Sequence, residues 1–129
     1  MSEPKVVLDT SAVIAYLNGE PGSERVSSHL SGALLSSVNL CEIVSKYADW
    51  GEDAEQVLSD VEGLEVEIVL FSPAQALFAA QLRPATRSLG LSLGDRACLA
   101  LGLECDAIVL TADKAWAELE KPHRIEVLR

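Results

Sequence analysis

The segment KVVLDTS, residues 5–11, has the pattern of a buried β-strand that runs directly into a helix. Residues 5–8 form a short, mostly apolar run, Asp9 closes it, and Thr10 and Ser11 open the helical pattern that follows. A strand with apolar residues in succession, rather than alternating with polar ones, is typical of a parallel sheet covered on both faces. Asp9 is therefore expected at the carboxyl end of such a strand.

Four further runs of strand length follow, and helical patterns separate them. These runs are residues 34–38, 66–71, 107–110 and 125–128. The chain of 129 residues has no repeat and no linker long enough to divide it, and its 49% hydrophobic content can fill one core of that size. The sequence therefore predicts an α/β fold with a five-stranded parallel sheet, in a single domain spanning residues 1–129.

Three of the helices have recognisable starts. The segments NLCE (39–42) and SLGD (92–95) each place a capping residue three positions before an acid. In SPAQ (72–75), Ser72 caps a helix that has proline at its first position, and the glutamine completes a capping box. The first two segments place an acidic residue in the first turn of a helix.

Four acidic residues can meet at one edge of this sheet. Asp9 follows the first strand, and Asp113 stands two residues after Thr111, at the end of the fourth; Glu42 and Asp95 lie in first helical turns. In open parallel sheets, ligands bind outside the carboxyl ends of the strands, where side chains distant in sequence converge. We therefore treat the four acids as a candidate site, although each one alone is better explained as a helix cap or as a favourable charge at a helix start.

Four clustered carboxylates require cations. Two unit charges about 4 Å apart repel by about 4 kcal/mol at an effective dielectric of about 20, which is large against a typical stability of about 5–15 kcal/mol. Mg²⁺ and Mn²⁺ suit such a set because hard ions take oxygen ligands and accept phosphate oxygens as well. The acids therefore predict hydrolysis of a phosphodiester by metal-activated water.

The composition is acidic. Twenty acidic and ten basic residues give a net charge of -10, and many of the acids crowd into residues 52–67, which is typical of a solvated face. Non-specific attraction to a phosphate backbone should be weak, so nucleic-acid binding would depend on a local patch or on metal ions.

The sequence indicates a cytoplasmic protein. Residues 1–5 lack the apolar segment of a signal peptide, and no apolar run approaches the length of a membrane span. Cys41, Cys98 and Cys105 have no metal-ligand spacing and are each flanked like small core residues, so neither a disulfide framework nor a zinc site is expected.

Four segments resemble the PIN-domain family, and in particular the VapC-type toxins of bacterial and archaeal toxin–antitoxin pairs. The segments are VVLDTS (6–11), SVNLCE (37–42), LSLGDRAC (91–98) and VLTADKAW (109–116). They occur in the order of the family and extend over almost the whole chain. The resemblance implies a three-layer α/β/α PIN-like fold with strand order 3-2-1-4-5 and an endoribonuclease that depends on Mg²⁺ or Mn²⁺.

The resemblance also implies the site and its partners. It assigns metal binding and catalysis to Asp9, Glu42, Asp95 and Asp113. It makes Thr111, Asn39 and Ser11 their polar supports. It implies an RNA substrate, a homodimer, and a cognate antitoxin whose tail lies across the active site. The negative charge gives a basic, Arg-bearing tail a physical reason to bind there.

Two other functions compete with this interpretation. In an aspartyl-phosphate domain, Asp9, Thr111 and Lys114 would carry phosphoryl transfer, but Ser11 stands where a phosphatase of that type has its second Asp, and Glu42 would have no role. A non-catalytic, acidic PIN-like binding module would keep the fold and use the acids only to recruit a basic protein.

Overall fold

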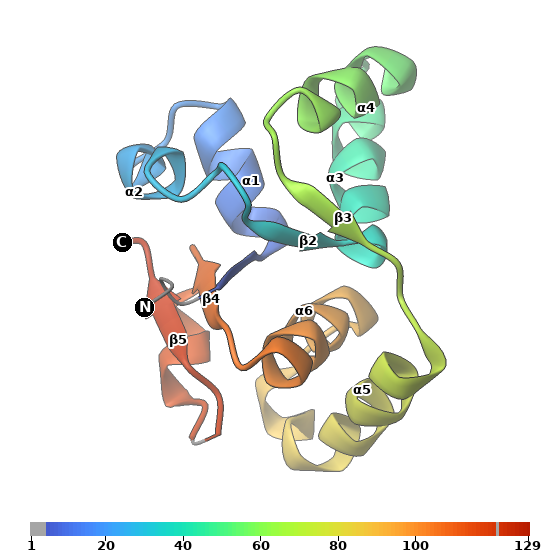
Figure 1. Ribbon diagram of the computed structural model, residues 1–129, viewed down its shortest axis with the longest axis vertical. Helices are drawn as coiled ribbons and strands as arrows, with labels where there is room; N and C mark the ends of the chain where they lie inside the picture. Colours follow the sequence, from blue (N-terminus) through green and yellow to red (C-terminus); the bar gives the residue numbers. More distant parts are fainter. Residues whose placement is uncertain (1–4, 121) are drawn as a thin grey trace.

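The computed structural model describes residues 5–120 and 122–129, and its centre is a five-stranded parallel sheet (Figure 1). The strands are β1 (Val6–Leu8), β2 (Leu34–Ser36), β3 (Glu67–Val69), β4 (Ile108–Thr111) and β5 (Ile125–Val127), in the order β3-β2-β1-β4-β5. In the middle strand, Val7 pairs with Leu34 on one side and with Val109 on the other. The predicted fold class and strand order are confirmed.

Helices cover both faces of this sheet. The helical elements are α1 (Thr10–Leu17), α2 (Ser23–Ser27), α3 (Ser37–Asp49), α4 (Ala54–Glu62), α5 (Pro73–Ala85), η1 (Arg87–Leu89), α6 (Leu93–Cys105) and η2 (Lys114–Glu118). In Figure 1, α1 to α4 lie on one side of the strands, and α5 and α6 lie on the other. The predicted three-layer arrangement is confirmed.

The alternation of side chains along β1 divides the core into two parts. Val6 and Leu8 belong to a cluster that includes residues of α1 to α4, whereas Val7 packs with Leu99 and Trp116 in a cluster built mainly on α6. Because successive side chains of a strand point to opposite faces, an apolar run of three residues serves both layers. This explains why β1 is a continuous apolar run rather than an alternating pattern.

Two of the three predicted helix starts are confirmed, and one is wrong. Ser72 accepts a hydrogen bond from the N–H of Gln75, and Ser92 forms a full capping box with Asp95. The predicted cap at Asn39 is wrong: α3 begins at Ser37, because the hydroxyl of Ser36 accepts from the N–H of Val38 and ends β2 two residues early.

Some side chains differ from the sequence-based expectation. Gln75 does not complete a capping box; it is buried, and its amide donates to Glu104. Cys98 is buried, as expected for a core residue, whereas Cys105 is half-buried and Cys41 is exposed on α3. No helix within residues 5–120 and 122–129 is long and apolar enough to cross a bilayer.

Shortening a buried side chain on a central strand tests the assigned core. Leu110 on β4 is fully buried, so Leu110→Ala should lower the free energy of unfolding by about 2–5 kcal/mol, through lost burial and a residual cavity. Leu70, which is 77% exposed, is the matched control. Leu70→Ala should change the free energy of unfolding by less than about 0.5 kcal/mol. Urea unfolding measures both, and equal losses would contradict the assigned core.

Candidate metal centre

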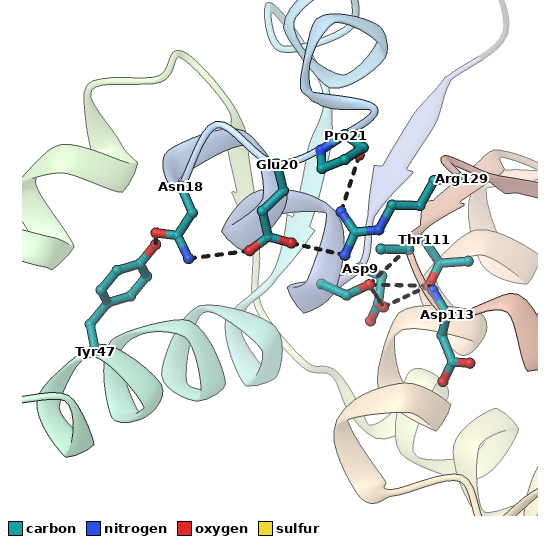
Figure 2. Close-up of polar contacts among 10 residues, drawn as sticks. Asp9, Asn18, Glu20, Pro21, Tyr47, Thr111, Asp113 and Arg129 are labelled. Carbon is teal, nitrogen blue, oxygen red and sulfur yellow. Dashed lines mark hydrogen bonds and ion pairs between the residues drawn. The ribbon is translucent and has the colours of Figure 1, made fainter.

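The sheet topology brings the first and fourth strands together, and with them Asp9 and Asp113. Asp9 directly follows β1, and its backbone N–H donates to the carbonyl of Leu110 on β4 at 3.0 Å. Asp113 follows β4 by two residues and is the N-cap of η2. Figure 2 shows Thr111 joined by hydrogen bonds to Asp9 and to the backbone of Asp113. The two strand-end acids therefore share one polar network.

The Asp9 carboxylate is buried, and only one of its oxygens is satisfied. Its Oδ2 accepts from the hydroxyl of Ser11 at 2.6 Å and from that of Thr111 at 2.9 Å. Ser11 is itself held, since its oxygen accepts from the N–H of Ala112. The side chain of Asp9 is 3% exposed, and no described residue donates to Oδ1. A buried, unpartnered carboxylate oxygen is costly unless a ligand satisfies it.

Glu42 is anchored from a neighbouring helix. Its Oε1 accepts from the hydroxyl of Thr10 at 2.7 Å and from the amide of Asn39 at 3.1 Å. The same amide also donates to the carbonyl of Gly94, at the start of α6. Asn39 is thus a support of the site rather than a helix cap, and Thr10 is a support that the sequence analysis missed, although its place directly after Asp9 is a signal for it.

Asp95 and Asp113 are helix caps as well as candidate ligands. Asp95 Oδ2 accepts from the N–H of Ser92 at 2.9 Å, and Asp113 Oδ1 accepts from the N–H of Ala115 at 3.0 Å. Asp9 stands at the N-cap of α1 but makes no capping hydrogen bond with its side chain. Capping therefore accounts for two of the four acids, and it uses one oxygen of each.

The acids also interact through their charges. Burial, with a smaller contribution from the charge of Asp95, raises the pKa of Asp9 to about 6, against the lowering effect of the Ser11 and Thr111 hydroxyls. Burial likewise raises the pKa of Asp95, and the charges of Glu42 and Asp113 add to the shift while the Ser92 hydrogen bonds oppose it. A bound cation would offset both the cost of burying the charged carboxylates and the repulsion between them.

The carboxylate oxygens of the four acids suit a hard cation, although they do not form a complete coordination site. Among the residues that the structure describes, no group of three or more His, Cys, Asp or Glu side chains is arranged to hold a metal ion. Each of the four carboxylates nevertheless has one oxygen anchored by the protein. The free Oδ1 of Asp9 and the all-oxygen chemistry of the set suit Mg²⁺ or Mn²⁺ better than zinc.

The parallel sheet with strand order β3-β2-β1-β4-β5 between two layers of helices is that of a PIN-like α/β/α domain. The family model for the PIN domain matches residues 6–122, so the chain belongs to the PIN-domain family. A search of curated proteins found no match.

Solved structures share this fold. A chain of a toxin–antitoxin complex from Klebsiella pneumoniae matches with a TM-score of 0.77 and 15% identity, over 97% of this chain and 98% of that one. DNA-bound VapBC from Salmonella typhimurium matches with a TM-score of 0.73 and 22% identity, over 98% and 100% of the two chains. VapBC-1 from nontypeable Haemophilus influenzae matches with a TM-score of 0.73 and 19% identity, over 95% and 97%.

The buried charge of Asp9 should make stability depend on pH. A raised pKa means that the folded state binds the proton more tightly than the unfolded chain, so the free energy of unfolding falls as pH rises from about 4 to about 6. The shift corresponds to about 3 kcal/mol. Asp9→Asn, which carries no charge, should lose this dependence, so its stability relative to the wild type should increase across that window in metal-free buffer.

The control for this experiment is Asp49→Asn, since Asp49 is an exposed acid near the end of α3. Urea unfolding at several pH values measures the difference between each variant and the wild type. A difference that stays constant between pH 4 and pH 7 for Asp9→Asn would contradict the buried, unsatisfied carboxylate.

Proposed function

We propose that this protein is a VapC-type toxin, an endoribonuclease that hydrolyses RNA phosphodiester bonds with Mg²⁺ or Mn²⁺. The observation that carries the proposal is the Asp9 carboxylate, which is buried, holds one unpartnered oxygen and lies within the electrostatic field of Asp95. Membership of the PIN-domain family supports the same chemistry, because its nucleases generally use divalent metal ions.

Each residue of the site has a distinct role in this proposal. Asp9, Glu42, Asp95 and Asp113 would hold the metal, which would supply activation of a water molecule and stabilisation of the leaving oxygen. Ser11 and Thr111 occupy Oδ2 of Asp9 and leave Oδ1 for a ligand. Thr10 and Asn39 hold Glu42 in the same way through its Oε1. Orienting partners of this kind strengthen metal binding.

The RNA strand would approach along a groove beside Glu42. This groove has a volume of about 420 Å³, and its lining includes Lys46, Ser92 and Leu93. Lys46 supplies a positive charge next to an acidic residue, which suits a phosphate held between the protein and a cation. With a net charge of -10, affinity for RNA would depend on this local arrangement rather than on the general surface.

We also infer a basic antitoxin and, as the resemblance to VapC-type toxins implies, a homodimer in the cytoplasm. The solved structures that share the fold include toxin–antitoxin complexes. An Arg-bearing tail is complementary to four acids in a protein with twenty acidic residues. Such a tail would compete with the metal for the free carboxylate oxygens.

The two rival functions have less support. Phosphoryl transfer through an aspartyl intermediate leaves Glu42, which Thr10 and Asn39 hold in place, without a role. A purely non-catalytic acidic module offers no reason for burying Asp9 with an unsatisfied oxygen.

The central experiment is RNA cleavage by purified protein. Wild-type protein should cleave single-stranded RNA in Mg²⁺ or Mn²⁺, and EDTA should abolish cleavage. Asp95→Asn removes a charge from a ligand and should reduce the rate at least about 100-fold. Asp49→Asn, the exposed control, should cleave at the wild-type rate. Equal rates for the wild type and Asp95→Asn would favour the binding module.

A second experiment tests the partner. A synthetic peptide with several Arg residues should inhibit cleavage, and raising the Mg²⁺ concentration should relieve the inhibition, because the guanidinium groups and the metal compete for the same oxygens. The matched control is the same peptide with Gln in place of every Arg. Equal inhibition by both peptides, or inhibition that ignores Mg²⁺, would count against a basic antitoxin tail.

A further inference from the structure

Gly94 lies against the carboxylate of Glu42. It is a buried residue in the first turn of α6 and directly precedes Asp95. A Cβ atom built on Gly94 would overlap the Glu42 carboxylate, and the three atoms nearest to it would be both carboxylate oxygens and the carbon between them. Position 94 therefore has no room for a side chain while Glu42 keeps its place.

The requirement at this position concerns space and not backbone conformation. Gly94 is not among the glycines with positive φ, and it sits within a helix, where Ala is the better residue by intrinsic propensity. The local backbone would thus favour Ala. Ala is opposed by the side chain of Glu42 on α3, which lies 52 positions earlier in the chain.

The surrounding hydrogen bonds keep Glu42 in this place. The Asn39 amide donates both to Glu42 Oε1 and to the carbonyl of Gly94, each at 3.1 Å, and the Thr10 hydroxyl donates to Oε1 at 2.7 Å. Three helices, α1, α3 and α6, therefore meet at one carboxylate. Glu42 cannot withdraw from Gly94 without stretching or breaking these bonds.

We propose that Gly94 is a positioning residue of the candidate metal centre, whose missing side chain makes the space in which Thr10 and Asn39 hold Glu42 beside Asp95. The inference rests on the proposed function. A side chain at position 94 displaces Glu42 from Thr10 and Asn39, and the carboxylate then lies away from the other ligands. The composition of the ligand set is unchanged, but its geometry is lost.

Gly102 provides a matched control on the same helix. It is buried, and a Cβ atom there would lie 2.7 Å from Cγ2 of Val109, a core side chain on β4. Gly102→Ala therefore crowds the core, whereas Gly94→Ala crowds an acidic residue of the site.

The first part of the test measures the contact itself in metal-free protein. Gly94→Ala and Gly102→Ala should each lower Tm by several degrees. In a Glu42→Ala background, most of the loss caused by Gly94→Ala should disappear, because the obstructing carboxylate is gone, whereas the loss caused by Gly102→Ala should remain. An undiminished loss for Gly94→Ala in that background would overturn the inference.

The second part measures Mn²⁺ affinity by calorimetry and RNA cleavage at saturating Mn²⁺. Gly94→Ala should weaken Mn²⁺ binding at least about tenfold, as expected for loss of an orienting contact, and Gly102→Ala should bind and cleave like the wild type below its Tm. A Gly94→Ala protein that binds Mn²⁺ and cleaves RNA normally would overturn the role of Gly94 and leave the proposed function intact. Wild-type protein that neither binds Mn²⁺ nor cleaves RNA would overturn the proposed function, and this role with it.

Discussion

The burial of the Asp9 carboxylate at the end of β1 is the constraint on which the rest of the site depends. An ionised carboxylate that is 3% exposed needs hydrogen-bond donors or a cation, and the described residues supply donors to only one of its oxygens. Those donors, Ser11 and Thr111, come from α1 and β4. Ser11 is local, two residues after Asp9, whereas Thr111 reaches Asp9 because β1 and β4 are parallel neighbours. The strand order of the sheet therefore supplies one of the two donors to Oδ2.

In the other three acids, too, the protein holds one carboxylate oxygen. A structural role for these residues is therefore compatible with a role in metal binding. Asp95 and Asp113 cap their helices with one oxygen each, which leaves the second oxygen for another partner. Capping fixes the rotation of a carboxylate in the way that Thr10 and Asn39 fix Glu42. A helix start is therefore a suitable place for a metal ligand, because the backbone N–H group that needs a cap also orients the carboxylate.

Sequence patterns predicted the elements well and the caps less well. The five strands predicted from the apolar runs, the strand order implied by the family resemblance and the capping box at Ser92 agree with the structure. Asn39 and Ser36 are both good capping residues, and the sequence does not say which one the helix uses. Both side chains are buried, and their hydrogen-bond partners decide: Ser36 ends β2 and caps α3, while Asn39 donates to Thr10 on α1 and to Gly94 on α6. Cys41 shows the same limit, because its apolar flanks predicted burial and the helix turns it outward.

The sequence by itself determined the family motifs, the apolar runs of the sheet and the four acids, since these depend on local order along the chain. Only the tertiary structure decided which oxygen of each acid is held, that Thr10 supports Glu42, and that Gly94 must lack a side chain. The physical reason is separation: Thr111 reaches Asp9 across 102 positions, and Gly94 meets the helix of Glu42 through an Asn39 bond that spans 55. Contacts of that range exist only after the strands have paired and the helices have packed on them.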